Sequence, residues 1–571
     1  MENDAVADIL DEIADLLELK DANEFRIRSY RSAARTVRDL TDRLEDLVAQ
    51  DEDLSSLPNI GQSTAQKIHE MLDRGTCTRL EELREEVPRG LVELMHVPYV
   101  GPRTAMELQR KLGVENLDDL QKACEKHHVR KLSGMGQKTE ERILEGIATV
   151  RGTAERILYK VAADHAKSLA RYLDGIPQIK GWEFAGSFRR RKETVGDLDV
   201  LLDARDREKA TEVLTTYEAV ADVLSRGSER VSVRLRSGLQ IDFRFFEPSA
   251  FGAALVYFTG SKAHNITLRR RAQDHDWKLN EYGLFKGKRR LAGKTEQSVY
   301  QRLSLPWIPP ELREDRGEIE AADQNALPHL IKPKHIRGDL HVHTNATDGQ
   351  NTIEEMARAA RDRGYEYLAI TDHSKAVRVA KGLDDTRLRK HVEAIRSVND
   401  AIRGLRLLAG VEVDILKSGK LDLNEKTLSE LDWVVAAVHS HFDLSEKKMT
   451  ERLLTAIRSG VIHCIAHPTG RMIGKRDPIR FDAQKVFGAC AEHNVRLEID
   501  SQPNRLDLPD THCQDALKAG VSFTIITDAH STAALELMLL GVNVARRGWL
   551  EKKDVLNTRT IAQLRKELDL D

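Results

Sequence analysis

The sequence is poor in cysteine and in aromatic residues, and it has no long apolar run. Its five cysteines form no Cys-x-x-Cys pair, so we expect neither a disulfide framework nor a tetracysteine zinc site. No stretch approaches the ~18 uninterrupted apolar residues of a membrane helix, and the acidic start is unlike a secretory signal. We therefore expect a cytoplasmic protein without a membrane partner.

Size and charge indicate the number of domains and the kind of nucleic-acid partner that the chain could bind. At ~150 residues per domain, the 571 residues suggest roughly four domains, and 40% hydrophobic with 32% charged residues is a soluble globular composition. Aromatic residues at 5% argue against binding single strands by stacking alone. The net charge of −3 means that local basic patches must hold any nucleic-acid partner. Composition carries no sign of oligomerisation, and a monomer is expected.

The hydrophobic pattern divides the chain into regions. Residues 1–155 have apolar residues at helical spacing, and strand-like runs among helices follow residue 176, which predicts an α+β region. The acidic segment 311–330 is expected to be an exposed connector. From residue 336, seven apolar runs alternate with helical segments, which favours a parallel barrel over an open doubly wound sheet. The strand-like runs are residues 182–185, 198–202, 231–235 and 239–245, then 339–343, 367–371, 405–413, 433–438, 461–466, 495–499 and 521–527.

A short turn pattern recurs three times in the helical region, at residues 57–61, 97–101 and 132–136. It resembles the helix-hairpin-helix motif, in which backbone N–H groups and a helix dipole bind a DNA phosphate. At the first hairpin position Asn59 tolerates a left-handed backbone, whereas Tyr99 is strained there, so the grip of the middle hairpin is in doubt. Three ordinary helix–turn–helix connections are the alternative. The glycines expected to lie against DNA are Gly61, Gly101, Gly134 and Gly136.

Three aspartates are the candidates for a catalytic centre. Asp197 and Asp199 stand two apart in a strand-like run, so their side chains face the same way, and Asp242 in another run can join them. Oxygen-rich sites of this kind suit Mg²⁺ or Mn²⁺, which activate an attacking hydroxyl and neutralise nucleotide phosphates. A solvated Asp-x-Asp turn is the alternative.

A Gly-Ser element stands ten residues before this pair, and the two together resemble the nucleotidyltransferase signature. The resemblance implies that Gly186 and Ser187 hold the terminal phosphates of a nucleotide through a backbone N–H and a hydroxyl, helped by Arg190.

Residues 257–269 and 280–282 resemble the nucleotide-binding thumb of family X DNA polymerases, the group that contains DNA polymerase beta. The resemblance covers roughly residues 1–310. A core role for the aromatic pair and a solvated face for the arginines are the alternatives. The resemblance implies Tyr257 and Phe258 against the incoming sugar, Asn265 at the minor-groove edge of the nucleotide, Arg269 on the template, and Gly260 and Lys262 beside the nucleotide.

The sequence departs from this family at several positions. Lys262 replaces an acidic residue, and Gln240 stands where an arginine contacts the carboxylates in the vertebrate enzymes. In the N-terminal region, Lys67 matches the Schiff-base lysine of the family's lyase domain and Tyr30 matches a pocket tyrosine, but Ser63 replaces an accompanying lysine. A surface lysine that contacts phosphate is as good an interpretation of Lys67 as catalysis.

Nine ligand-type side chains lie at or just after the carboxyl ends of six strand-like runs in the last region. That edge is where barrel enzymes build their active sites. A lone histidine at a strand end is usually structural, but nine such residues favour a metal centre. They are His341, His343, Asp348, His373, Glu412, His439, His467, Asp528 and His530.

This constellation resembles the polymerase and histidinol phosphatase (PHP) family, with every ligand position filled. The resemblance implies a phosphoesterase with two or three Mn²⁺, Zn²⁺ or Fe ions. Glu498 and Asp500 are expected behind the ligands, and Arg505 is a candidate phosphate clamp. The implied ligand sets are His341, His343, Glu412 and Asp528 for one ion, Glu412, His439 and His467 for a second, and Asp348, His373 and His530 for a third.

These features predict a multidomain chain with an all-α helix-hairpin-helix N-terminal region, an α+β nucleotidyltransferase palm with a thumb, and a C-terminal α/β distorted (β/α)7 PHP barrel. The predicted boundaries are 1–78 for a lyase-like helix-hairpin-helix domain, 79–155 for a fingers-like one, 156–250 for the palm, 251–315 for the thumb, 316–335 for a linker and 336–571 for the PHP phosphoesterase domain.

The leading hypothesis is a bacterial-type family X DNA polymerase that uses dNTPs to fill short gaps in gapped or primed duplex DNA during base-excision repair. Its PHP domain is expected to act as a 3′–5′ exonuclease, to process 3′ ends and to incise at abasic sites. The protein is expected in the cytoplasm, associated with the nucleoid through DNA. A small-molecule phosphatase of the histidinol-phosphate type with a regulatory DNA-binding front half is the alternative, and a DNA-binding scaffold with vestigial sites is a third hypothesis.

Overall fold

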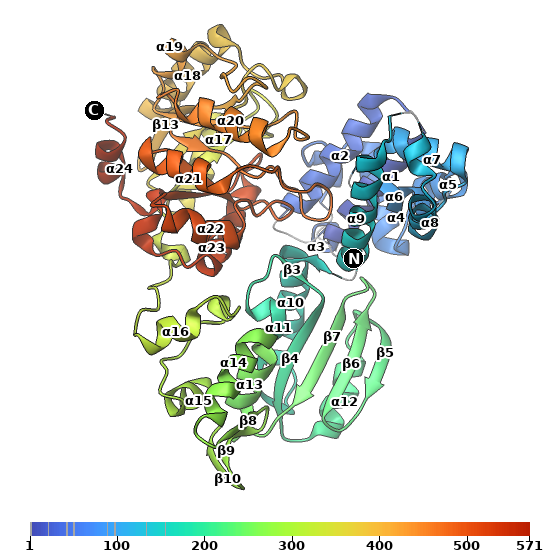
Figure 1. Ribbon diagram of the computed structural model, residues 1–571. Coiled ribbons are helices and arrows are strands. Elements are labelled where there is room, and N and C mark those ends of the chain that lie inside the picture. Colours follow the sequence, from blue (N-terminus) through green and yellow to red (C-terminus); the bar gives the residue numbers. More distant parts are fainter. Residues whose placement is uncertain are drawn as a thin grey trace.

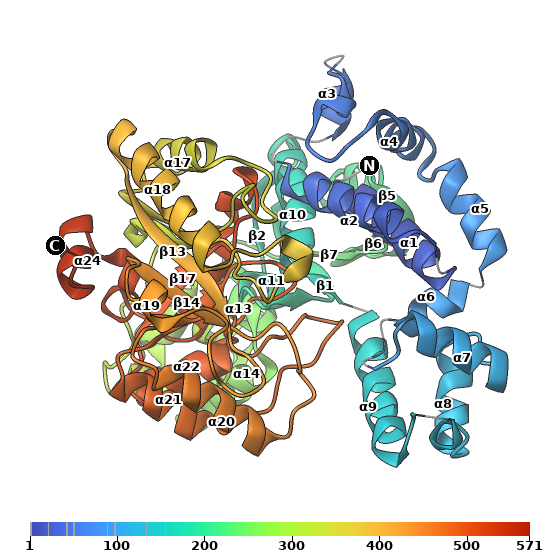
Figure 2. The same ribbon diagram turned by 90° about the horizontal axis from the view of Figure 1, so that it is seen from above.

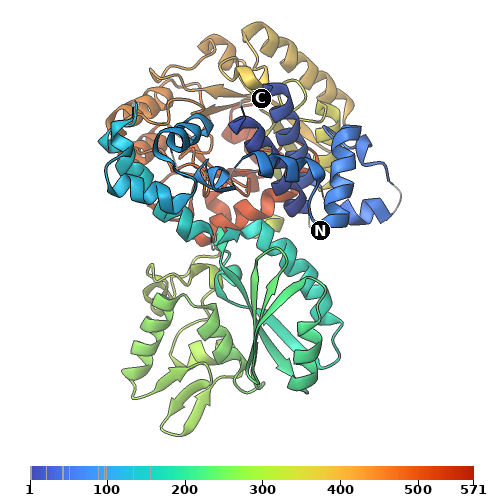
Figure 3. The ribbon, with the colours of Figure 1, turned by 90° about the vertical axis from the view of Figure 1, so that its right-hand side faces the viewer.

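The computed structural model describes residues 3–20, 22–40, 44–49, 52–87, 89–95, 97, 99–132, 134–154 and 156–570. Figure 1 shows a helical unit at the N-terminus, an α+β unit below it, and a C-terminal barrel beside the helical unit; Figures 2 and 3 show this arrangement from above and from the side. Pro98 and Ser133 of two hairpin patterns lie outside the described residues. None of the described helices combines the length and apolarity that crossing a bilayer takes.

The N-terminal unit is all helical, as the apolar spacing predicts. Its apolar side chains meet in one core that extends from Val6 to Ile147. Asn23 and Asn116 cap two of the helices by accepting backbone N–H groups. The helices are α1 (Asn3–Leu19), α2 (Glu24–Asp39), α3 (Leu44–Ala49), α4 (Gln62–Arg74), α5 (Thr78–Glu86), α6 (Arg89–Met95), α7 (Pro102–Leu112), α8 (Leu117–Glu125) and α9 (Gln137–Ala154).

A five-stranded sheet, which we call the palm sheet, has the strand order β2-β4-β7-β6-β5. All four strand-like runs predicted in this region are strands of this sheet. Its centre is a parallel pair, β4 and β7, in which Asp199 lies level with Asp242. The elements are β1 (Ile157–Leu158), α10 (Tyr159–Asp174), β2 (Ile179–Phe184), α11 (Gly186–Arg189), β3 (Thr194–Val195), β4 (Asp197–Ala204), α12 (Arg207–Thr215), β5 (Val220–Arg226), β6 (Arg230–Leu235) and β7 (Gln240–Phe245).

A smaller unit with a three-stranded sheet follows the palm sheet and has its own apolar core. Residues of the following segment pack into that same core, among them Ile319 and Leu330. The elements are α13 (Phe251–Thr259), α14 (Lys262–Gln273), β8 (Lys278–Asn280), β9 (Gly283–Lys286), β10 (Arg289–Ala292), α15 (Glu296–Arg302) and α16 (Glu318–Asp323).

The expectation of an exposed connector at residues 311–330 is wrong. Arg313 is buried and donates to Glu296 at 2.7 Å, and the buried carboxylate of Glu318 lies 2.6 Å from Nδ1 of His264. Paired charges can be buried at far lower cost than isolated ones. The partners Glu296 and His264 lie outside the segment. The segment's own polar composition therefore predicted exposure, because it gave no sign of these pairs.

Seven parallel strands form the C-terminal barrel in chain order, β11 to β17, which confirms the barrel over the open sheet. The two end strands meet where His343 N donates to the carbonyl of Ala529 at 2.9 Å. Asn557 bridges them further, because its Nδ2 donates to the carbonyls of Gly338 and Ile525. The elements are β11 (Gly338–Val342), α17 (Ile353–Asp362), β12 (Tyr367–Ile370), α18 (Asp385–Ala401), β13 (Arg406–Asp414), α19 (Glu425–Leu428), β14 (Trp433–Ala437), α20 (Glu446–Ile457), β15 (Cys464–Ile465), α21 (Ala483–Glu492), β16 (Arg496–Asp500), α22 (Asp510–Lys518), β17 (Phe523–Ile526), α23 (Met538–Arg547) and α24 (Ile561–Glu567).

Candidate active sites

The three predicted aspartates meet on the two central strands of the palm sheet. One ligand oxygen of each carboxylate, in Asp197, Asp199 and Asp242, lies within 4.8 Å of the others. Burial, followed by the charge of Asp197, raises the pKa of Asp199 to about 7. Carboxylates that oppose one another's ionisation in this way are stabilised by a shared cation, so these residues fit divalent metal ions.

Two arginines that the sequence did not single out lie at this triad. Arg230 on β6 donates to Oδ2 of Asp242 at 2.6 Å. Nε of Arg244 lies 3.6 Å from Oδ1 of Asp199, and Nη2 of Arg244 lies 3.4 Å from Oδ2 of Asp242. Together they place positive charge beside the carboxylates where Gln240 supplies only an amide. Arg244 follows Asp242 by two residues and so shares its face of the strand, a spacing that could have indicated its role. The position of Arg230 beside Asp242 depends on the pairing of β6 with β7, which the sequence did not show.

The Gly-Ser element lies directly against the triad. Gly186 has a φ of +63°, and a Cβ there would lie 2.5 Å from Oδ2 of Asp199, so any other residue would be strained and would displace that carboxylate. Ser187 follows it in α11. Arg190 donates to Glu314 at 3.0 Å and to the carbonyl of Thr259, so its guanidinium joins the palm sheet to the next unit.

The other residues predicted to bind the nucleotide lie on α13, on α14 and in the turn between them, and one of them, Phe258, contacts an arginine at the triad. The guanidinium carbon of Arg244 stands 4.4 Å from the ring centroid of Phe258. Tyr257 is exposed, and its carbonyl accepts a hydrogen bond of 2.7 Å from Nδ2 of Asn265. Gly260 lies in the turn between the two helices, Lys262 begins α14, and Arg269 follows on the same helix.

The three hairpins share one backbone geometry. Asn59, Tyr99 and Gly134 all have a left-handed φ, of +59°, +72° and +81°. Tyr99 therefore adopts the conformation despite the strain expected of it, with the guanidinium of Arg142 5.1 Å from its ring centroid. A Cβ would meet nothing within 4 Å at any of the four predicted contact glycines, so these positions leave room for a partner to approach: Gly61, Gly101, Gly134 and Gly136.

Lys67 lies on α4 and is half-buried. Its Nζ donates to the carbonyl of Ser63 at 2.8 Å and to Oγ of Ser63 at 2.7 Å. The residue that replaces the second lysine is therefore the direct partner of Lys67. Tyr30 is buried, and burial raises its pKa.

The structure brings all nine predicted ligands of the barrel together at the carboxyl ends of its strands. Eight of them form three overlapping groups that could each hold an ion, and His343 and His373 each belong to two of these groups. Nε2 of His341 and Nε2 of His343 lie 3.1 Å apart. The groups are His343, Asp348, His373 and His530; His341, His343 and Asp528; and His373, Glu412 and His439, with Nε2 of His467 3.0 Å from Oε1 of Glu412.

Several buried atoms of this cluster make no hydrogen bond with any of the described residues. One is Nδ1 of His343. Two others, Nδ1 of His373 and Oε2 of Glu412, lie 2.7 Å apart at ion-pair distance but without hydrogen-bond geometry. Leaving such atoms unsatisfied in a protein interior is costly. Imidazole nitrogens mixed with carboxylate oxygens are ligands of transition metals, so these residues fit such ions.

Carboxylates behind the cluster orient its histidines. Oε1 of Glu498 lies 2.8 Å from Nδ1 of His341, and Oδ1 of Asp414 lies 3.1 Å from Nδ1 of His439. Burial acts to lower the pKa of His341, but Glu498 and Glu412 raise it well above its ordinary value. The role of Glu498 was predicted. Asp414 was missed, although its place two residues after Glu412 on one strand could have indicated it.

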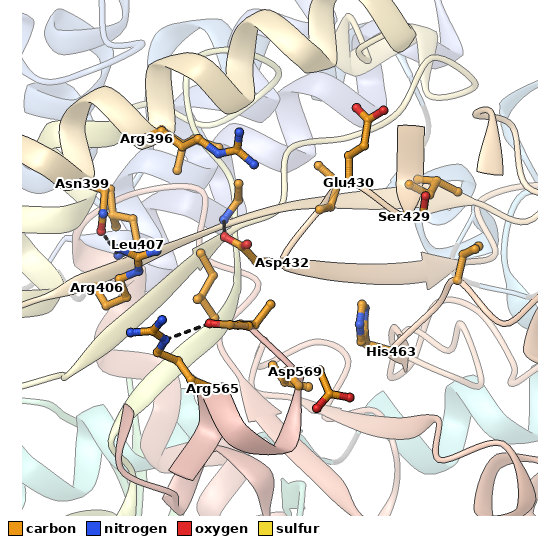
Figure 4. Close-up of a pocket in the computed structure, with 18 of the residues that line it drawn as sticks. Arg396, Asn399, Arg406, Leu407, Ser429, Glu430, Asp432, His463, Arg565 and Asp569 are labelled. Atoms are coloured by element: carbon orange, nitrogen blue, oxygen red, sulfur yellow. Dashed lines mark hydrogen bonds between the residues drawn. The ribbon is translucent and has the colours of Figure 1, made fainter. Parts of the chain in front are cut away.

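One cavity lies away from this chemistry. It measures about 670 Å³ and opens at the amino ends of the barrel strands, beside the start of β13 (Figure 4). Its lining mixes both signs of charge, with Arg406 and Arg565 near Asp432 and Asp569. In barrel enzymes this end serves stability rather than catalysis, so we assign it no reaction.

Buried ion pairs fix the loop after α11 to the barrel. Arg547 at the end of α23 donates to the carbonyl of Arg190 at 2.8 Å, to Glu314 at 3.0 Å and to Asp510 at 2.7 Å. Arg190 pairs with the same Glu314. The barrel therefore holds the backbone that directly follows the Gly-Ser element.

Comparison with known families accounts for most of this architecture. Family models match for a helix-hairpin-helix domain at residues 1–77, a SAM-like helix-hairpin-helix tandem at 91–149, the DNA polymerase beta thumb at 254–314 and the PHP domain at 339–501. The two hairpin matches and the thumb match fall on the helical unit and on α13 to α15.

Similar proteins fall into two groups. The "DNA polymerase/3'-5' exonuclease PolX" of Bacillus subtilis is 37% identical over 557 residues, which is 97% of each chain. DNA polymerase lambda of Arabidopsis thaliana is 26% identical over 50% of this chain and 57% of its own length. A probable phosphatase of Photobacterium profundum is 32% identical, but over only 34% of this chain and 78% of its own length. The similarity to the first of these extends over nearly the whole of both chains. Together with the thumb, hairpin and PHP matches, it shows that this chain belongs to the bacterial family X DNA polymerases that carry a C-terminal PHP domain.

Proposed function

We propose that this protein fills short gaps in duplex DNA with dNTPs and removes nucleotides from 3′ ends, and that both activities serve base-excision repair. The observation that carries the proposal is the presence of two separate clusters of ligand-type side chains in one chain, the aspartate triad of the palm sheet and the histidine cluster of the barrel. The Bacillus subtilis relative, named for both activities, spans the same two regions.

In the polymerase reaction, Asp197, Asp199 and Asp242 would hold Mg²⁺ or Mn²⁺. Such ions lower the pKa of the primer hydroxyl and neutralise charge on the triphosphate. The contribution of the protein is to keep the three carboxylates converged: Arg230 and Arg244 both donate to Oδ2 of Asp242 and hold it in place. The nucleotide would be bound by the Gly-Ser element and by the side chains of α13 and α14 named above.

In the exonuclease reaction, the nine barrel ligands would hold Mn²⁺, Zn²⁺ or Fe ions, which polarise a phosphodiester and supply a nucleophile at neutral pH. Glu498 and Asp414 fix the tautomers of His341 and His439, so that each imidazole presents Nε2 to the cluster. Incision at abasic sites is proposed for the same centre. Lys67 is proposed as a deoxyribose-phosphate lyase nucleophile, tested by borohydride trapping.

The two active sites should be separable by mutation. Asp197→Ala and His341→Ala proteins would be given gapped duplex, dNTPs and Mn²⁺. Extension should vanish only in the first variant and 3′ trimming only in the second, since the two residues lie in different units. The opposite pattern would reject the assignment.

The similarity to phosphatases is confined to the barrel, so we do not pursue a small-molecule phosphatase as a second candidate. A preference for histidinol phosphate over 3′-ended DNA would revive it. We propose the domain boundaries given by the sequence pattern, with 316–335 attached to the thumb core rather than free. We also propose a monomer that acts in the cytoplasm on nucleoid DNA.

A further inference from the structure

A cavity of about 210 Å³ lies between the N-terminal helical unit and the barrel. One wall is formed by Ser32 and Arg35 of α2 with Pro58 and Asn59 of the first hairpin, and the other by residues 348–350 after β11. In Figures 1 and 2, α2 lies on the side of the helical unit that faces the barrel. The first DNA-binding hairpin and the histidine cluster therefore open onto one space.

The barrel wall of this cavity includes Asp348, which belongs to the histidine cluster. Oδ2 of Asp348 lies 3.2 Å from Nε2 of His530, and Oδ1 of Asp348 lies 3.7 Å from Nδ1 of His343. The nitrogen of His343 is buried and has no hydrogen-bond partner among the described residues. A phosphodiester bound for hydrolysis at this cluster would thus have its neighbouring nucleotide beside the cavity.

The opposite wall contributes an unpaired cation. Arg28, Arg31 and Arg38 on the same helix each pair with a carboxylate of their own unit. The side chain of Arg35 is exposed and makes no hydrogen bond or ion pair with any residue in the described part of the chain. A free guanidinium is suited to two oxygens of a phosphate.

The hairpin beside Arg35 adds backbone donors. Asn59 has its left-handed φ of +59°, and Gly61 is the N-cap of the thirteen-residue helix α4, which therefore begins without a side-chain cap. Uncapped N–H groups at such a helix start are donors for an anion. Arg35 and Asn59 border the cavity together with Asp348, and α4 begins three residues after Asn59.

We propose that Arg35 and the first hairpin bind the DNA phosphate immediately 5′ of the one cleaved in the histidine cluster. The N-terminal helical unit is then part of the exonuclease substrate site, in addition to binding DNA during polymerisation. This assignment rests on the proposed exonuclease function of the barrel. Arg35 binds the nucleic-acid backbone, and the barrel ligands carry out the hydrolytic step.

The test compares Arg35→Gln with Arg28→Gln, a matched control on the same helix whose arginine is exposed and, within the described ranges, pairs only with Glu24. Trimming of a 3′-recessed duplex with Mn²⁺ would be measured beside hydrolysis of bis(p-nitrophenyl) phosphate, which has no second phosphate. We expect Arg35→Gln to raise the KM for DNA about tenfold, to reduce the slope of log KM against log salt by about 1, and to leave the small diester unchanged. Arg28→Gln should behave like the parent protein.

A substrate change tests the position of the contact. A methylphosphonate at the linkage immediately 5′ of the scissile one removes that single charge. The parent protein should then lose about as much affinity as Arg35→Gln loses on normal DNA, and the variant should lose nothing more, because both changes remove one contact. Additive losses, or a KM for DNA equal to that of Arg28→Gln, would overturn the proposal. Undiminished trimming by His341→Ala would instead overturn the exonuclease assignment itself, so the two failures are distinguishable.

Discussion

Alanine at position 186 should damage polymerisation and leave 3′ trimming intact. The new Cβ would lie 2.5 Å from Oδ2 of Asp199, whereas ordinary van der Waals contact begins at 3.4 Å, so the carboxylate must move by about 0.9 Å. A displacement of ~1 Å in a catalytic constellation costs roughly 100-fold in rate. We therefore expect kcat for filling a one-nucleotide gap to fall about 100-fold in Gly186→Ala, because the metal-binding oxygens no longer converge.

The left-handed backbone complicates this variant, and a second glycine provides the control. Alanine at a φ of +63° also adds roughly 1–2 kcal/mol of strain to the folded state. Gly238 has a φ of +88°, but a Cβ there meets nothing within 4 Å. Gly238→Ala should therefore lose similar stability in a thermal melt and retain gap filling. Equal loss of kcat in both variants, or a normal kcat in Gly186→Ala, would show that the carboxylate clash is not the cause.

Three further outcomes follow from the same geometry. Tyr99→Gly should stabilise the full chain by about 1 kcal/mol in denaturant unfolding, because it relieves a φ of +72°; a loss of stability would contradict this. Burial and Arg496 lower the pKa of His463 to about 4, so its contribution to stability is complete above about pH 6.5 and is lost as the pH falls to about 4. His463→Gln should abolish that loss, which amounts to at most about 3 kcal/mol, and an unchanged pH slope would refute it. Arg547→Met leaves half-buried Glu314 with one cation fewer; it should raise the KM for dNTP about tenfold while trimming persists, and an unchanged KM in the folded variant would show that the barrel does not position the nucleotide site.

Much of the fold follows from local periodicity. Each strand-like run of the barrel became a strand, because a parallel strand buried on both faces needs a continuous apolar run. The paired aspartates and His341 with His343 were predictable for a related reason, since residues two apart on a strand face the same way. The left-handed turn at Tyr99 was the exception, because the hairpin geometry overrides the preference of a single tyrosine.

The sequence by itself thus determined which segments of the barrel are strands, which edge of the barrel carries the ligands, and that Asp197 and Asp199 face the same way, because each depends on spacings of a few residues. Only the tertiary structure decided that Arg230 serves Asp242, that the acidic segment with Arg313 is buried, and that Arg35 faces the histidine cluster. The physical reason is that charges find their partners through space. A charge whose partner lies many residues away leaves no local pattern in the chain.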